Sequence, residues 1–160
     1  VENVPNFCIF RGFHGAISDF LHLCCSCVRM HAKKDRYFAY FEDAKFLKTV
    51  KVKAFLGKCL SFFSVHRWCV MSEKWDACCR NTKSKYVSIP TGRGHYFGEV
   101  VERSTMLPVK EVPFAERSYF TMAQPDKYLT NLYGDYHRIP PVEQREAHGI
   151  LELELGETNE

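Results

Sequence analysis

Apolar side chains in the first half of the chain recur every three or four residues, the spacing of an amphipathic helix. A first helix is predicted over residues 12–33, where lysines at the end suit a helix C-terminus. A second is predicted within residues 43–69, with Gly57 as a point of interruption, and a third over residues 72–80 with Ser72 as N-cap. The predicted core sides consist of Phe13, Ile17, Phe20, Leu21, Cys24, Cys27 and Val28 in the first helix, and Phe46, Leu47, Val50, Ala54, Phe55, Leu60 and Phe62 in the second.

Beyond Arg80 the pattern changes to short apolar runs between turn residues, which is typical of strands. Residues 85–89 and 96–101 are two such runs, and residues 109–114 and 118–122 predict a hairpin around 115–117. A helix is predicted over residues 125–132, ended by Gly134, and a last one begins at Pro140-Pro141 and frays at 156–160. Three helices, a small antiparallel sheet and short C-terminal helices predict an α+β fold, with residues 1–160 as a single domain.

Composition narrows the class of protein. The chain has 160 residues, of which 46% are hydrophobic and 14% aromatic, and this is enough apolar surface for one core. No apolar run reaches the roughly 18 residues of a membrane span, and the first residues do not resemble a signal peptide. We therefore expect no membrane span, a cytoplasmic location and reduced cysteines. Residues 1–6 read like the middle of a chain, so we also expect part of a longer protein.

Charge is unevenly distributed along the sequence. Residues 29–85 carry 14 basic and 5 acidic side chains, whereas residues 111–160 carry 4 basic and 10 acidic ones. Such a basic middle suits an anionic ligand, for example a nucleotide, a phosphate or a polyanionic glycan. The alternative is that the two segments attract each other in the folded protein. Nucleic acid is not an expected partner, because the cations are not condensed on one helix and no reading motif accompanies them.

Eight cysteines raise the question of a metal site. Cys24 and Cys27 form a C-x-x-C motif with His31 four residues beyond, and these three with Cys78 or Cys79 offer a zinc ligand set. The alternative is core packing, because buried cysteine behaves as a small hydrophobic residue and these positions continue the apolar stripe. A thioredoxin-like redox pair is not expected, because the C-x-x-C lies within a predicted helix.

Three further places offer candidate binding chemistry. In Tyr133–Pro141, Gly134 allows a positive φ, Asp135 offers a carboxylate, and Tyr136 offers a ring and a hydroxyl, so the segment suits the wall of a substrate site. The glycine-rich residues 91–95 suit a backbone cradle for phosphate, with Arg93 adding charge. His148 is a candidate general acid or base. The structural alternatives are a helix end, an ordinary turn and a surface histidine.

One ordered series of residues resembles a known family. It runs through Leu107-Pro108, Val112-Pro113-Phe114, Pro125-Asp126-Lys127-Tyr128-Leu129, Tyr133-Gly134-Asp135-Tyr136-His137-Arg138-Ile139-Pro140-Pro141 and His148. This series resembles the C-terminal part of the LicD family, phosphotransferases that transfer phosphocholine and related groups to bacterial surface glycans such as lipopolysaccharide or teichoic acid. Glu2-Asn3-Val4-Pro5 is similar to a segment that follows a core strand in that family. The resemblance implies a nucleotide-activated donor, an anionic glycan acceptor and a divalent metal, Mg²⁺ or Mn²⁺.

The chain departs from the family in one important respect. The resemblance implies an upstream nucleotidyltransferase-like core with a Gly-Gly segment and an Asp-rich motif, and neither Gly-Gly nor Asp-x-Asp occurs among the 160 residues. Without the acidic cluster, we expect this portion to hold no cofactor and to be inactive in isolation. It is either the C-terminal portion of a LicD-like enzyme or a noncatalytic remnant or interaction module with a structural zinc site. Self-association through the face left by the missing core is a further expectation.

Overall fold

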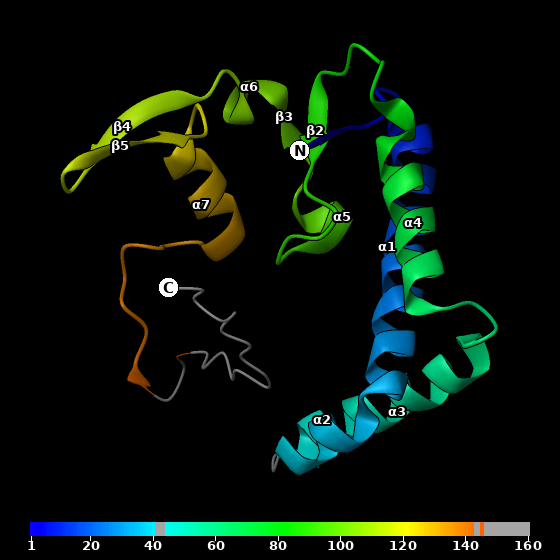
Figure 1. Ribbon diagram of the computed structural model, residues 1–160. Helices are drawn as coiled ribbons and strands as arrows, with labels where there is room; N and C mark the ends of the chain where they lie inside the picture. The colour runs from blue at the N-terminus through cyan, green and yellow to red at the C-terminus, as the bar shows by residue number, and fades with distance from the viewer. Residues whose placement is uncertain (41–43, 143–144, 146–160) are drawn as a thin grey trace, which may run out of the picture.

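The structure, a computed structural model, describes residues 1–40, 44–142 and 145, and it has the predicted α+β fold (Figure 1). The helices are α1 (Cys8–Ala32), α2 (Lys34–Tyr40), α3 (Ala44–Leu60), α4 (Val65–Asp76), α5 (His95–Gly98), α6 (Arg103–Met106) and α7 (Pro125–Tyr133), and a 3₁₀ turn, η1 (Ala77–Cys79), continues α4. The strands are β1 (Glu2–Asn3), β2 (Tyr86–Ser88), β3 (Val101–Glu102), β4 (Lys110–Phe114) and β5 (Arg117–Thr121).

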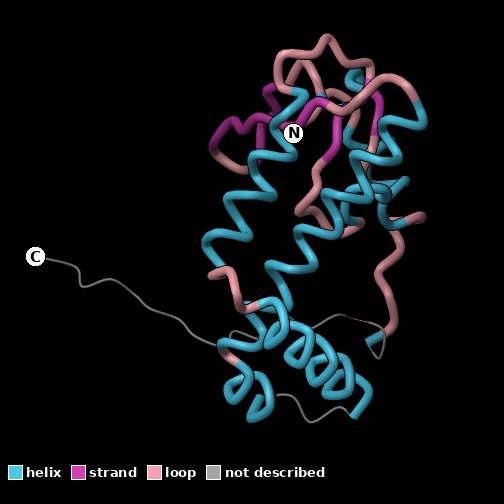
Figure 2. Tube along the Cα trace, turned by 90° about the vertical axis from the view of Figure 1, so that its right-hand side faces the viewer, coloured by secondary structure: helices cyan, strands magenta, loops and turns pink. Residues whose placement is uncertain are grey.

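Helix α1 organises the helical part of the molecule. It runs beside α4 and packs against α3 towards its C-terminal end, and the strands gather at the opposite end of this helical arm (Figures 1 and 2). The core here contains Leu21, Cys24, Cys25, Val28 and Trp68. Burial of these apolar side chains contributes about 25 cal/mol per Å² removed from water, and this burial holds the three helices together.

The buried face of α1 agrees with the prediction in the second half of the helix, where Leu21, Cys24, Cys27 and Val28 are buried, but differs from it in the first half. Phe13 and Phe20 were expected in the core, but their exposed fractions are 63% and 56%. The inward positions at this end of the helix hold His14 and Ser18, which bond to the end of α4. The apolar stripe therefore predicted the core side of the second half of α1, whereas polar pairing with α4 occupies the inward positions of the first half. Phe46, Phe55 and Phe62 of the second predicted core side are exposed as well, while Val50 and Ala54 are buried.

Helix α3 lies within the predicted range 43–69, but Gly57 does not interrupt it, and the predicted start of the third helix at Ser72 was wrong. Helix α3 ends at Leu60, and α4 begins after Ser64. The side-chain oxygen of Ser64 accepts a hydrogen bond from the Arg67 amide at 3.2 Å. This is an N-cap, because it satisfies a donor that has no partner within the helix. Ser72, the predicted N-cap, is buried inside α4, where its hydroxyl donates to the Cys69 carbonyl at 2.8 Å. Helix α2 is an additional short element beyond the three predicted.

A three-stranded antiparallel sheet, ordered β1-β2-β3, joins the N-terminal residues to residues 86–102. The predicted strand at residues 85–89 is confirmed by β2, but residues 96–98 are helical and only Val101–Glu102 pairs with β2. Tyr96 is fully buried against Gly15 of α1, and its amide donates to the Asp19 carboxylate at 3.0 Å. These contacts with α1 explain why this apolar run is not a strand.

The C-terminal part of the described chain is close to its prediction. Strands β4 and β5 form the hairpin, with Lys110 opposite Thr121 and Phe114 opposite Arg117, so only Ala115 and Glu116 form the loop. A second apolar cluster, built on Val87, Met106 and Tyr128, packs α7 near the sheet. The helix predicted from Pro140 and the fraying at 156–160 fall largely outside the described residues. Within the described ranges, no helix combines the length and apolar character needed to cross a membrane.

Candidate functional site

The chain turns sharply where α7 ends. Gly134 has φ 70° and ψ −125°, a conformation that strongly favours glycine, and its amide donates to the Thr130 carbonyl at 2.8 Å. The Tyr136 amide then donates to the Gly134 carbonyl at 2.9 Å, and the Arg138 amide donates to the Asp135 carbonyl at 3.2 Å. The predicted helix end is confirmed, and this local network fixes the turn that follows α7.

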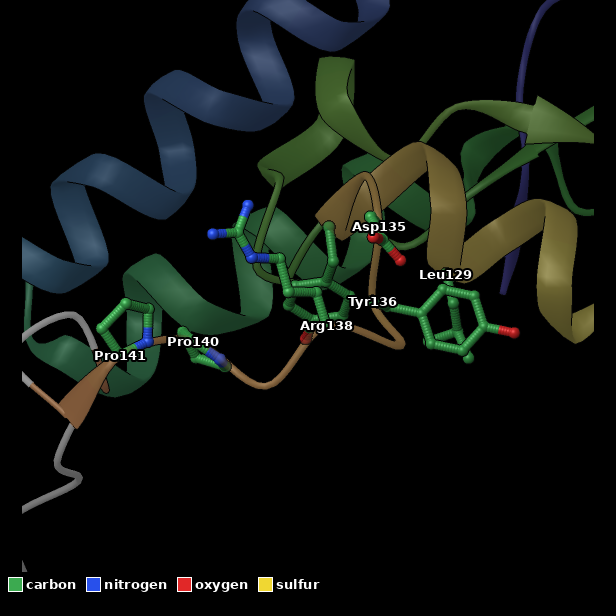
Figure 3. A pocket seen from close by; sticks show the side chains of 7 residues that line it. Leu129, Asp135, Tyr136, Arg138, Pro140 and Pro141 are labelled. Atoms are coloured by element: carbon green, nitrogen blue, oxygen red, sulfur yellow. The ribbon is translucent and has the colours of Figure 1, made fainter.

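This turn creates the largest of the cavities described here, about 690 Å³ in volume (Figure 3). Its lining residues are Leu129, Tyr133, Asp135, Tyr136, Arg138, Pro140 and Pro141. The structure thus places three of the predicted site residues, Tyr133, Asp135 and Tyr136, around one space. Gly134 lines a neighbouring cavity of about 340 Å³ together with Asp126 and His137. The volume of the larger cavity suits a small organic ligand.

The two polar side chains predicted for this site differ in their surroundings. The hydroxyl of Tyr136 donates a hydrogen bond to the Asp126 carboxylate in the first turn of α7, and this bond raises the pKa of the phenol. The side chain of Asp135 forms no hydrogen bond or ion pair with another described residue. Its carboxylate is therefore available to a ligand, whereas the hydroxyl of Tyr136 already holds the wall of the cavity in place.

Arg93 lies beside this cavity although it is forty residues away in the sequence. Its guanidinium carbon lies 5.3 Å from the centre of the Tyr133 ring, within the range of a cation–π contact. The structure therefore brings together Arg93 and Tyr133, two residues that the sequence predicted as parts of a site. His148 lies outside the described residues.

A buried glutamate positions the loop that carries Arg93. Glu99 is 1% exposed, and its carboxylate accepts hydrogen bonds from the Gly94 amide at 2.7 Å and from the Tyr128 hydroxyl. A Cβ at Gly92 would lie 2.1 Å from the same carboxylate, so only glycine fits there. Glu99 was not predicted as a site residue, because nothing in the spacing around it indicates that it bonds to Tyr128.

The loop does not form the predicted backbone cradle for phosphate. The Gly92 amide donates to the Ile89 carbonyl at 2.9 Å, the His95 amide donates to the Gly92 carbonyl at 3.1 Å, and the Gly94 amide is held by Glu99. These donors are already engaged inside the protein, so they are not directed towards an external anion. Residues 91–95 are a positioning turn, and Arg93 is their candidate contribution to binding.

The predicted zinc set is not assembled either. Cys24 and Cys27 are buried in the helical core, and burial raises the pKa of both thiols. No described metal-binding group joins these two cysteines to His31, and Cys78 lies instead beside His14 and Cys79. The packing alternative is therefore correct for Cys24 and Cys27. All eight cysteines are free thiols, and Cys8, Cys59 and Cys78 are exposed.

A second, basic cavity lies where the sheet meets η1. It has a volume of about 500 Å³, and its lining includes the cations Arg80, Lys83, Lys85 and Arg103. No acidic side chain is among its lining residues. Part of the predicted basic middle of the chain thus gathers around one polar cavity, although Arg80 and Lys85 also approach Glu2 and Glu102 at 4.0 and 3.9 Å.

Comparison with known proteins identifies no relative of this chain. Neither a protein-family model, nor a curated protein, nor a solved structure matches this chain.

Proposed function

We propose that this chain is the C-terminal portion of a LicD-like phosphotransferase, and that the cavity beyond α7 binds part of its phosphorylated substrate. The observation that carries the proposal is the gathering of Tyr133, Asp135, Tyr136 and Arg138 around one cavity. These residues belong to the segment on which the resemblance to the family depends. Their position around a cavity supports a binding role for that segment, in addition to its structural role at the end of α7.

The lining chemistry suits a zwitterionic group such as phosphocholine. A guanidinium binds phosphate through paired N–H donors, and Arg138 supplies one within the lining. Aromatic rings and a carboxylate attract a quaternary ammonium group, and Tyr133, Tyr136 and Asp135 supply both. Arg93, in contact with the Tyr133 ring, adds positive charge at the edge of the site.

The divalent metal of the family does not fit the residues of this chain. Mg²⁺ and Mn²⁺ prefer carboxylate, carbonyl and water oxygens, and the sequence holds no Asp-x-Asp motif. Among the described residues, the one group of three or more side chains close enough to share a metal ion consists of a histidine and two cysteines, which is a softer ligand set. We therefore assign no step of phosphoryl transfer to this chain alone. Its role is to bind and orient a substrate.

The basic cavity supplies a place for the other expected partner. An anionic glycan chain is attracted by clustered cations, and Arg80, Lys83, Lys85 and Arg103 line a cavity without an acidic residue. This assignment makes a specific distinction: phosphocholine binding depends on the cavity beyond α7, whereas a polyanionic glycan depends on residues 80–85 and Arg103.

An exposed face of α1 favours a second candidate function, an interaction module. Ile9, Phe13, Phe20 and Leu23 are all exposed, and with Ala16 they follow a four-three spacing. Such spacing forms the seam of a coiled coil, and pairing of two identical α1 helices would bury it. On this reading the chain self-associates, and the double substitution Phe13→Ser with Phe20→Ser lowers its mass in sedimentation experiments to that of a monomer.

Calorimetric titration with phosphocholine tests the first function. The wild-type chain should show saturable binding, and both Arg138→Gln and Asp135→Asn should weaken it at least tenfold. Arg117→Gln on the exposed strand β5 is the matched control and should bind as the wild type does. Thermal melts accompany each titration, and Asp135→Asn should leave the melting temperature unchanged because no described residue pairs with that carboxylate. Equal affinities for wild type and all variants would overturn the proposal.

A further inference from the structure

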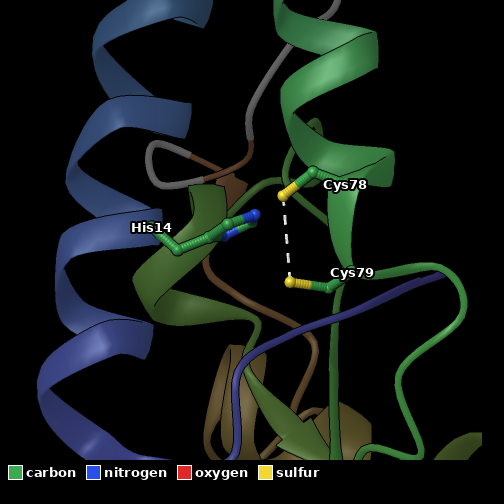
Figure 4. A group of neighbouring side chains, drawn as sticks. All are labelled: His14, Cys78 and Cys79. Atoms are coloured by element: carbon green, nitrogen blue, oxygen red, sulfur yellow. Dashed lines mark hydrogen bonds between the residues drawn. The ribbon is translucent and has the colours of Figure 1, made fainter.

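A histidine and two cysteines from separate helical elements meet where α1 passes the end of α4. His14 comes from α1, and Cys78 and Cys79 come from η1 (Figure 4). One ligand atom from each residue lies within 4.8 Å of the other two. This cluster lies apart from the residues lining the cavity beyond α7, and the function proposed above does not use it.

Hydrogen bonds and a ring contact hold the imidazole of His14 in one orientation. Its Nε2 lies 3.2 Å from the carbonyl oxygen of Trp75, and a carbonyl only accepts, so Nε2 carries the proton. Nδ1 therefore carries the lone pair, which accepts from the Tyr96 hydroxyl at 3.2 Å. A metal ion bound at Nδ1 would take the place of this hydrogen bond. The ring is also stacked on Trp75, with centroids 5.4 Å apart and planes at 21°. A backbone carbonyl that fixes the second ring nitrogen is the usual outer support of a metal-bound histidine.

The two sulfur atoms have the separation that one zinc ion needs. Zn–S bonds of about 2.3 Å at a tetrahedral angle place two thiolates about 3.8 Å apart. The Sγ atoms of Cys78 and Cys79 are 3.8 Å apart. Adjacent residues usually point their side chains in different directions, but the 3₁₀ turn places these two on the same side of the backbone, as Figure 4 shows.

The three residues differ in their exposure to solvent, so the site is open on one side. His14 is 4% exposed and Cys79 is half-buried, while Cys78 is exposed. An ion can therefore enter from solvent past Cys78 and find its deepest ligand already held in place. Two thiols and a neutral imidazole are soft ligands that suit zinc and exclude magnesium or calcium.

We propose that His14, Cys78 and Cys79 bind one Zn²⁺ ion, with a water molecule as the fourth ligand on the open side. Binding exchanges the two thiol protons for the metal, and no electron transfer is involved. The ion would connect α1 to the C-terminal end of α4, so it stabilises the folded state in proportion to its affinity and concentration.

The test uses the full chain, reduced and freed of metal with a chelator. Titration of Zn²⁺ against a competing chromophoric chelator should show one equivalent bound, and Co²⁺ should give the near-ultraviolet charge-transfer band of a thiolate-bound metal. Cys78→Ser changes an exposed residue, so the fold should be preserved while zinc affinity falls at least tenfold. Cys59→Ser, an exposed cysteine outside the cluster, is the matched control. Zinc should raise the melting temperature of wild type and Cys59→Ser, but not of Cys78→Ser.

Three results would overturn the site. The first is no zinc uptake by the reduced wild-type chain. The second is unchanged uptake and an unchanged cobalt spectrum in Cys78→Ser. The third is a wild-type chain whose only reaction at this pair is oxidation, seen in air as a mass loss of two hydrogens that Cys78→Ser prevents. A negative phosphocholine titration leaves this inference standing, because the zinc measurements do not depend on the cavity beyond α7.

Discussion

The hydroxyl of Tyr128, in the middle of α7, donates a hydrogen bond to the carboxylate of Glu99, and both residues are buried. Burial, together with this bond, raises the pKa of the Tyr128 phenol, so the hydroxyl remains a donor throughout the neutral range. The same carboxylate holds the Gly94 amide. One side chain thus ties the loop of Arg93 to the helix that ends at the candidate site.

Removal of this hydroxyl tests the connection. Tyr128→Phe keeps the ring in the apolar cluster but leaves one carboxylate oxygen of Glu99 without a donor, so it should lower the free energy of unfolding by about 1–3 kcal/mol. Tyr119→Phe, on the exposed hairpin, should change it by less than about 0.5 kcal/mol. Chemical denaturation of both variants measures the difference, and equal stability of the two would show that the Glu99 bond is unimportant.

A side chain at Gly134 should destabilise the protein because of the backbone conformation there, and not because of a steric clash. No atom lies within 4 Å of an added Cβ, yet φ is 70°, so Gly134→Ala should cost about 1–3 kcal/mol. Gly12 within α1 also has space for a Cβ but needs no positive φ. Gly12→Ala should therefore stabilise the protein by about 0.5–1 kcal/mol. Thermal melts that move in the same direction for both variants would contradict this assignment.

Stability should fall in alkaline solution because a buried thiol resists ionisation. Burial, reinforced by Cys69 and opposed by Arg29, raises the pKa of Cys25 from 9.0 to about 11. The unfolded thiol loses its proton first, so the stabilising contribution is complete below pH 9 and disappears as pH rises through 11. Urea denaturation between pH 8 and 11 measures the loss. Cys25→Ala should flatten this dependence, and an equally steep dependence in that variant would assign it to other groups.

The chain by itself should not transfer phosphocholine. It has no Asp-x-Asp motif, and phosphoryl transfer of this type depends on carboxylate-bound metal. Incubation with CDP-choline, Mg²⁺ or Mn²⁺ and a glycan acceptor should therefore give no product above the level of the heat-denatured chain. Turnover that rises with the amount of folded protein would contradict the assignment of a purely binding role.

Local patterns predicted those elements whose formation depends on neighbouring residues. The five residues from Pro125 to Leu129 and the glycine at 134 are enough to begin and end α7, and the short turn at Ala115 and Glu116 is enough to set the hairpin. The α+β class followed from the order of such elements. Helix α5 was not predicted because Tyr96 is held by α1. Its amide bonds to Asp19, which lies 77 residues away in the sequence, and no local pattern contains such a contact.

The candidate sites divide in the same way. Tyr133, Asp135 and Tyr136 were found because a contiguous segment lines the cavity. Glu99 was missed because its partner is 29 residues away, and His14 was missed because its partners Tyr96 and Trp75 lie 82 and 61 residues away. Hydrophobic periodicity predicted an apolar inward face for α1, whereas His14 and Ser18 on that face make hydrogen bonds with α4.

The most direct measurement of the proposed binding role is a map of backbone amide shifts in ¹⁵N-labelled chain titrated with phosphocholine. Saturable shifts should concentrate at residues 129–138 and at Arg93, with the hairpin of β4 and β5 unaffected. Asp135→Asn should abolish these shifts while the rest of the spectrum stays superimposable on the wild type. Shifts confined to residues 80–85, or no saturable shift at a millimolar excess of ligand, would contradict a substrate site beyond α7.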